Sequence, residues 1–342
     1  MSALVKKQIT LKDIAKALDL SPSTVSRSLK DHPGISAETK ELVQVYAREH
    51  KYKPNALALS LRTRKSNTIG VIIPEIVHYF FSSVLSGIEE EAEKNNYKVL
   101  FCQSNEDYER EITCTETLLS ASVCGVLVSV SKSTTQFQHF QEIIDSNIPM
   151  VFFDRICTGI NTDKVVVDDY AGAFNAVEYL IKTNCKRIVL LGGNSILAIS
   201  NNRRMGYEDA LRKYRIPVDK NLMFICDTVD LAREIVPGIL QQENKPDAFF
   251  AINDEVAASC INIVHSSGLK IPDDISVCGF TNSYISQFTT PNLTSVDQRG
   301  FEVGSTAARL LINRIKGTEK KEGIVSRVIK TKLVVRDSTR KI

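Results

Sequence analysis

Residues 21–29 offer three hydrogen-bonding side chains, those of Ser23, Ser26 and Arg27, on the outer side of a short predicted helix. A guanidinium can contact the O6 and N7 atoms of guanine together, and a hydroxyl can bond to either partner of a base pair. A helix that exposes such groups and buries little is typical of a DNA reader. The alternative is an ordinary helical hairpin with a solvated polar face.

Two helices joined by a tight turn must position these groups. In the first, apolar residues at positions 11, 14, 15 and 18 share one face, and Thr10 with Asp13 predicts the N-cap. The second begins at Ser21 as N-cap, with Pro22 at the first helical position, where a missing N–H costs nothing. Val25 then points inward. The pattern predicts a helix-turn-helix whose second helix enters the major groove.

The distribution of charge supports this interpretation. Residues 1–67 hold 13 lysines and arginines against 6 acidic residues, a net charge of +7, whereas the remainder holds 30 against 34, a net charge of −4. A basic segment confined to one end is the electrostatic footprint of phosphate binding, although basic arms are sometimes only solubilising.

A third helix, capped by Ser36, and an unusual segment at 53–65 follow the hairpin. Pro54 can start a helix over 55–62, but a helix of about eight residues is not stable alone in water. Its leucines have no evident core, and a basic cluster follows them. The segment makes sense if it folds when paired with its copy on DNA, where Leu61 can wedge between base steps in the minor groove. The alternative is a plain linker, which would more often be rich in Gly, Ser or Pro.

These motifs resemble the lactose-repressor (LacI/GalR) family of bacterial transcription regulators, and the resemblance covers nearly the whole chain. The family's header motif matches residues 10–29, and its hinge motif matches residues 52–61. The resemblance implies that Pro22, Ser23 and Arg27 face bases and that Leu61 intercalates. Many members have Arg where this chain has Leu59, so a minor-groove charge is missing.

We therefore expect a headpiece at 1–53, a hinge helix and linker at 54–67, and an effector-binding and dimerisation domain at 68–342. The predicted DNA contacts are Thr10, Ser21, Pro22, Ser23, Thr24, Ser26, Arg27, Asn55, Ala58, Leu61 and Arg62.

In the larger domain, short apolar runs alternate with helical stretches, which favours α/β architecture with parallel sheets buried on both faces. Strands are expected at 68–74, 97–103, 123–130, 149–154, 165–167, 187–192, 247–253, 275–280 and 293–296. Helices are expected at 81–95, 108–120, 172–183, 203–214, 254–267 and 300–316. The family resemblance implies two lobes hinged around a small molecule, as in periplasmic binding proteins, with three chain crossings between them.

Ligands of such sheets bind beyond the carboxyl ends of the strands, so candidate effector contacts lie there. They are Phe80, Phe81, Asp154, Tyr170, Arg203, Asn253, Asp254, Thr281 and Gln298. Arg203 falls where the family has its effector-binding arginine. Asp254 could equally be a helix N-cap, and the Phe pair could belong to the core.

Polar groups on both walls with aromatic rings between them suggest a sugar or sugar derivative. Many sugar-responsive relatives have a ligand-binding Asp where this chain has Thr281, so a phosphorylated sugar, a less polar metabolite and a vestigial site also stay open. Leu197 and Ile199 stand where purine-binding members place polar contacts, which argues against a purine.

Other chemistry is not indicated. The eight cysteines include no Cys-x-x-Cys pair and follow no secretory leader, so we expect reduced thiols in a cytoplasmic protein. The five histidines lack metal-ligand spacing, Gly192 and Gly193 form no phosphate loop, and no apolar run is long enough to span a membrane. We expect no cofactor, no metal and no enzymatic activity.

The sequence thus predicts a transcription regulator, most simply a repressor, that reads a near-palindromic operator in double-stranded DNA as a homodimer and responds to a small-molecule effector. The C-terminal residues lack the leucine heptads of a tetramerising coil. The alternatives are an activator or dual regulator with a non-sugar effector and, more remotely, a sugar-binding receptor.

Overall fold

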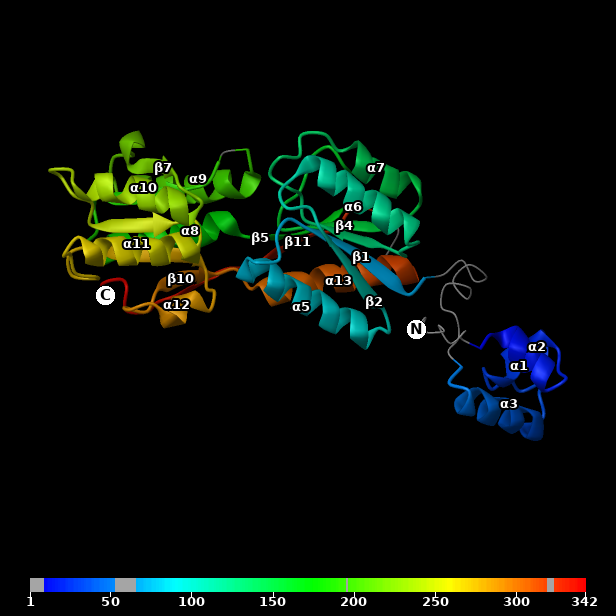
Figure 1. The fold of residues 1–342 in the computed structure, drawn as a ribbon. Helices are drawn as coiled ribbons and strands as arrows, with labels where there is room; N and C mark the ends of the chain where they lie inside the picture. Colours follow the sequence, from blue (N-terminus) through cyan, green and yellow to red (C-terminus); the bar gives the residue numbers. More distant parts are fainter. Residues whose placement is uncertain (1–8, 53–65, 195, 319–322) are drawn as a thin grey trace, which may run out of the picture. The chain divides into compact units, whose positions relative to one another are not determined.

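The computed structural model describes residues 9–52, 66–194, 196–318 and 323–342, which fall into two compact units divided between Ser66 and Asn67 (Figure 1). The predicted hinge residues Asn55, Ala58, Leu61 and Arg62 lie outside the described residues. Within the described ranges, no helix has the length and apolar character needed to cross a membrane.

The first unit is a three-helix headpiece, with α1 at Leu11–Ala17, α2 at Pro22–Ser28 and α3 at Ala37–Glu49. Thr10, Ser21 and Ser36 cap these helices as the sequence predicted, and Thr10 forms a reciprocal capping box with Asp13. A small core fixes the helix pair, and it consists of Ile14, Ala15, Val25, Val43 and Ala47.

The second unit contains two six-stranded sheets. The first has the order β11-β5-β4-β3-β1-β2, with β1 at Thr68–Ile73, β2 at Lys98–Gln103, β3 at Val126–Val128, β4 at Met150–Phe153, β5 at Asp163–Val167 and β11 at Ser326–Ile329. The second has the order β12-β10-β9-β8-β6-β7, with β6 at Ile188–Gly192, β7 at Met223–Ile225, β8 at Ala248–Ala251, β9 at Ser276–Thr281, β10 at Thr294–Asp297 and β12 at Lys332–Val334. All neighbours are parallel except β10 and β12.

Helices cover both faces of each sheet. The first lobe has α5 (Tyr79–Lys94) and α13 (Gly300–Lys316) on one face and α6 (Tyr108–Ser120) and α7 (Gln138–Asp145) on the other. The second has α10 (Val229–Leu240) and α11 (Asp254–Ser266) on one face and α8 (Asp169–Lys182) and α9 (Ala198–Lys213) on the other. A 3₁₀ turn at Lys220–Leu222 and the short α12 at Ile285–Phe288 complete the second lobe. The eight cysteines are free thiols, six of them buried.

The chain crosses between the lobes three times, since β5, α13 and β11 belong to the first lobe and β6, β10 and β12 to the second. This confirms the predicted α/β two-lobed architecture. The crossings place the carboxyl ends of the central strands of both sheets beside the lobe junction, where polar side chains gather.

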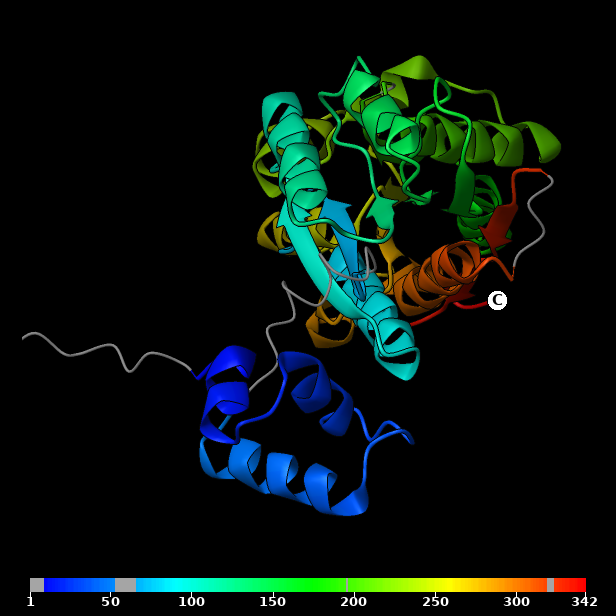
Figure 2. The same ribbon diagram turned by 90° about the vertical axis from the view of Figure 1, so that its right-hand side faces the viewer.

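Close backbone contact between α5 and α13 fixes the first lobe beside this junction (Figure 2). A Cβ at Gly87 would lie 2.1 Å from the Phe301 carbonyl oxygen, and one at Gly304 would lie 2.0 Å from that of Val84. Only glycine therefore fits at this crossing.

We expect Gly304→Ala to lower the free energy of unfolding by about 1–3 kcal/mol or more, because overpacking must push α5 and α13 apart. Gly238→Ala in α10 is the matched control, since a Cβ there meets nothing within 4 Å. It should be neutral or stabilise by up to about 1 kcal/mol through helix propensity. Urea unfolding followed by circular dichroism checks both, and equal effects would contradict the packing argument.

Candidate functional site

The headpiece presents α2 as an exposed, polar helix. Val25 is fully buried, whereas Pro22, Ser23 and Arg27 are exposed. The Ser21 hydroxyl accepts a hydrogen bond from the Thr24 N–H at 3.1 Å, and it lies 2.7 Å from the Ser23 hydroxyl. These contacts fix the first turn of α2, which in a helix-turn-helix approaches base edges.

The remaining predicted headpiece contacts lie beside this face. The Thr10 side chain is exposed at the start of α1, where its hydroxyl donates to Asp13 at 2.7 Å. The side chains of Thr24 and Ser26 are half-buried along α2. The first turn of a helix also has backbone N–H groups without intrahelical partners, and phosphate oxygens can accept from those that the cap leaves free.

A cavity of about 380 Å³ lies between the two lobes. Seven of the nine predicted effector residues line it: Phe80, Phe81 and Asp154 from the first lobe, and Arg203, Asn253, Thr281 and Gln298 from the second. Polar and aromatic groups from separate lobes therefore face one space, as the strand-end argument expects.

Tyr170 and Asp254 are not among the described residues that line this cavity. The Tyr170 hydroxyl donates to Asp209 on the surface of α9 at 3.0 Å, so its ring lies outside. The buried Asp254 carboxylate accepts from the Ser283 N–H and the Ser295 hydroxyl, and it links α11 to the loop after β9 and to β10. The N-cap of α11 is Asn253, whose side chain accepts from the Val256 N–H at 2.8 Å.

Arg203 is held by several contacts in the second lobe. It is 6% exposed, and it donates to the Asp169 carboxylate and to the Ile252 carbonyl, each at 2.7 Å. Its guanidinium carbon lies 3.9 Å from the centroid of the Phe280 ring. A buried arginine needs such partners, and here they hold it at the cavity wall.

Asp154 forms the opposite wall. Its backbone has a φ of +57°, which turns the chain sharply at the end of β4, and its side chain is buried. Desolvation by burial raises the pKa of Asp154 to about 6, and Arg155 opposes this rise only in part. The nearest Arg155 nitrogen is 3.9 Å from the carboxylate, too far for a hydrogen bond.

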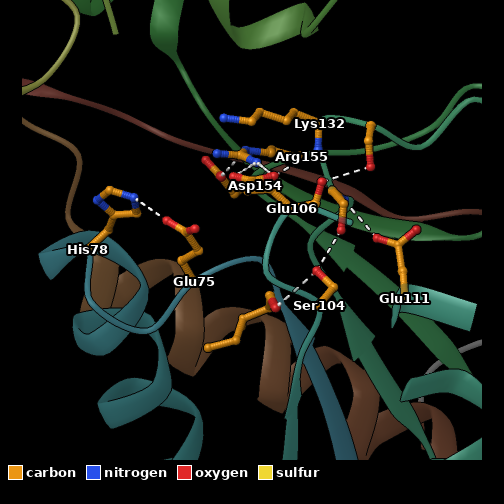
Figure 3. A network of polar contacts seen from close by, with 11 residues as sticks. Glu75, His78, Ser104, Glu106, Glu111, Lys132, Asp154 and Arg155 are labelled. Atoms are coloured by element: carbon orange, nitrogen blue, oxygen red, sulfur yellow. Dashed lines mark hydrogen bonds and ion pairs between the residues drawn. The ribbon is translucent and has the colours of Figure 1, made fainter. Parts of the chain in front are cut away.

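Glu106 organises the loops of the first lobe (Figure 3). Its carboxylate accepts from Arg155 Nη1 at 2.7 and 2.9 Å and from the Lys132 N–H at 2.8 Å. Behind it, the fully buried Glu111 accepts from the Ser131 N–H at 2.7 Å. Three loops that follow strands are thereby joined into one wall.

Several residues that line the cavity were not predicted from the sequence: Glu75, His78, Glu106, Lys132, Asp227 and Glu255. They lie in loops and first helical turns, where no periodic pattern exists. Their one available signal was position, since most of them follow a predicted strand within a few residues.

Comparison with known proteins identifies the family. A profile of the lacI family of bacterial regulatory proteins matches residues 10–55, and one of a periplasmic binding protein-like domain matches residues 177–339. The chain is 32% identical over 333 residues to the ribose operon repressor of Halalkalibacterium halodurans, covering 97% of each chain. It is 30% identical over 339 residues to the HTH-type transcriptional repressor PurR of Vibrio campbellii, covering 97% of this chain and 99% of the relative.

The chain belongs to the LacI family. It is a DNA-binding transcription regulator that responds to a small molecule. Among solved structures, the lac repressor dimer bound to operator matches 98% of this chain and 100% of its own, with a TM-score of 0.86 at 24% identity, which shows the same fold. A complex of the transcriptional regulator CelR with cellobiose matches 96% of this chain and 99% of its own, with a TM-score of 0.72 at 25% identity.

The raised pKa of Asp154 predicts a pH-dependent effect on this LacI-family body. The folded state holds the Asp154 proton up to about pH 6, against an ordinary value of 3.8, so wild-type stability falls as the pH rises through that window. Asp154→Asn should therefore raise the free energy of unfolding at pH 7.5 by roughly 1–3 kcal/mol, and with it the melting temperature. At pH 4 it should leave both unchanged. Melting curves across pH check this, with the exposed Asp273→Asn as control. An equal effect at both pH values would contradict it.

Proposed function

We propose that this LacI-family protein represses transcription in the cytoplasm as a homodimer on a near-palindromic operator, and that an uncharged sugar in the cavity between its lobes sets its affinity for DNA. The single observation that carries the proposal is this cavity, because both lobes line it and a bound ligand can bias their separation. An effector with different affinities for two lobe arrangements typically shifts DNA binding by about 1–3 kcal/mol.

The composition of the wall supports a hydroxyl-rich ligand. The Asn253 amide, the Gln298 amide and the Thr281 hydroxyl stand on the second lobe, and the rings of Phe80 and Phe81 on the first. Amide and carboxylate groups suit sugar hydroxyls, and aromatic rings suit the apolar face of a sugar. Two similar proteins carry carbohydrate names, the ribose operon repressor and the CelR–cellobiose complex, and this also supports a sugar as the effector.

The charges of the wall favour an uncharged sugar over a phosphorylated one. Of its cationic residues, Arg155 is already paired with Glu106 and Arg203 with Asp169. Lys132 is the remaining lysine or arginine among the described lining residues. The carboxylates of Asp154, Asp227 and Glu255 oppose it, and that of Glu75 is bonded to His78 at 2.9 Å. A phosphate group would meet net repulsion in this space.

A less polar metabolite is the second candidate, and the observation that favours it is an apolar stretch. Ile196, Leu197 and Ile199 line the same cavity beside Arg203. Their side chains offer no hydrogen bonds to hydroxyl groups.

An apolar surface on the body supports the homodimer. Val77 and Phe288 are each 80% exposed and Tyr284 is 64% exposed, with Ile76 and Ile285 beside them in sequence. Tyr79 and Tyr284 touch edge to face across the lobes, with ring centroids 4.8 Å apart, so the surface spans both lobes. Exposed apolar groups of this size favour association with a second copy.

In the proposed mechanism, effector binding changes the separation of the two first lobes of the dimer. This decides whether the two segments at 54–67 can fold together and place Leu61 in the minor groove. Such a switch couples a hinge motion to an order–disorder transition.

We expect Arg27→Ala to weaken binding to the selected operator by about 1–3 kcal/mol and to relax the base preference at one position of each half-site. The operator is determined for the wild type and for the variant by letting each protein select the sites it binds from a pool of random double-stranded DNA. The exposed Arg233→Ala on α10 is the control and should leave both properties unchanged. An unaltered selected sequence for Arg27→Ala would contradict its role in base recognition.

We expect neutral sugars to raise the melting temperature of the full-length protein in proportion to occupancy, while their phosphate esters do not. A thermal-shift screen of matched pairs, such as ribose with ribose 5-phosphate and glucose with glucose 6-phosphate, measures this directly. A larger shift with the ester of any pair would contradict the charge argument. Shifts from nucleobases or apolar acids alone would instead favour the second candidate.

A further inference from the structure

A second cavity of about 320 Å³, here called the distal compartment, adjoins the effector cavity at the lobe junction. The same six residues border both spaces: Lys132, Asp154, Arg155, Ile196, Leu197 and Ile199. The two spaces are therefore adjacent, and they are separated by no more than this shared border.

The walls of the distal compartment differ from those of the effector cavity. Phe137, Ile156 and Cys157 from loops of the first lobe form an apolar floor. Exposed polar side chains, those of Thr158 and Asn202, stand at its rim. An apolar floor with a polar rim suits a ring that has an apolar face and polar edges.

The border between the two spaces is held in place from the first lobe. Arg155 is clamped by Glu106, and its guanidinium carbon lies 5.6 Å from the centroid of the Phe81 ring. Lys132 is fixed through its backbone N–H to the same carboxylate. The second lobe contributes Leu197 and Ile199 to this border, so a ligand that crosses it contacts apolar side chains on that side.

We propose that the effector has two rings: a sugar ring in the effector cavity, and a second ring with an apolar face, either glycosyl or aryl, in the distal compartment. This inference rests on the proposed function and specifies its effector as a disaccharide or a glycoside. The apolar floor supplies binding free energy that a single sugar ring cannot obtain, because burying apolar area on both the ring and the floor removes it from water.

The test compares ligands that share one sugar and differ in the second ring. The sugar is the one that gives the largest shift in the thermal-shift screen. Its methyl glycoside, its phenyl glycoside and a disaccharide that contains it are each titrated into the full-length protein by isothermal titration calorimetry, which gives three affinities. We expect the phenyl glycoside or the disaccharide to bind about tenfold or more tightly than the methyl glycoside, a factor that one buried ring supplies. A gain with the phenyl glycoside alone assigns an aryl group to the compartment, and a gain with the disaccharide assigns a sugar.

Two variants localise the gain. Thr158→Trp fills the compartment from its exposed rim and should remove the difference between the ligands while leaving the affinity for the methyl glycoside unchanged. Thr135→Trp, an exposed threonine that does not border the compartment, is the control and should keep the difference. Because the chain contains no tryptophan, Phe137→Trp adds a single tryptophan on the floor, and its emission, excited at 295 nm apart from the ten tyrosines, should shift with two-ring ligands only.

Equal affinities for the three ligands in the wild type would overturn the inference, and so would a gain that survives Thr158→Trp. Neither result would affect the proposed function, because the methyl glycoside would still bind. If no carbohydrate binds at all, the proposed effector class fails, and this inference fails with it.

Discussion

The burial of one guanidinium at the lobe junction constrains the rest of the body. The Arg203 guanidinium is buried, so its charge requires polar or aromatic partners. They are the Asp169 carboxylate of α8, the carbonyl of Ile252 just after β8, and the Phe280 ring of β9. Arg203 therefore joins three segments of the second lobe at the wall of the cavity. The first lobe uses a carboxylate for the same purpose, since Glu106 ties three loops into a wall. Asn105 and Glu106 both adopt left-handed backbone conformations, and this arrangement persists because the surrounding hydrogen bonds stabilise it.

Much of the fold could be predicted from the chain because its parallel strands are buried on both faces and therefore appear as unbroken apolar runs. The elements that escaped prediction lack that signal. The strand Met223–Ile225 is short and lies at a sheet edge, with Ile225 exposed. The helix Val229–Leu240 contains Pro237, which argues against a helix in sequence but is tolerated in the structure. The helix Ala198–Lys213 begins five residues earlier than predicted, because Leu197 at its N-cap offers no side-chain hydrogen bond.

The cavity was harder to predict than the sheets. Position after a strand correctly indicated where polar groups gather, but it does not say which way a side chain points. Asp254 comes one residue after Asn253, yet its carboxylate turns into the lobe to accept from Ser283 and Ser295. Tyr170 is one residue past the buried Asp169, and one residue along a helix rotates a side chain by about 100°, which takes the ring to the outer surface. Glu106 depends on partners far away in the sequence, and no local pattern can reveal it.

The three crossings between the lobes have a consequence for synthesis of the protein on the ribosome. The first sheet is complete only when β11 has paired with β5, and the second only when β12 has paired with β10. Both partners come from residues 326–334, long after the other strands of the first lobe have been translated. A chain that stops short of this segment leaves β5 and β10 as edge strands, with the backbone groups that pair with β11 and β12 exposed, and exposed strand edges promote aggregation. Both sheets are thus completed only after translation has passed residue 334.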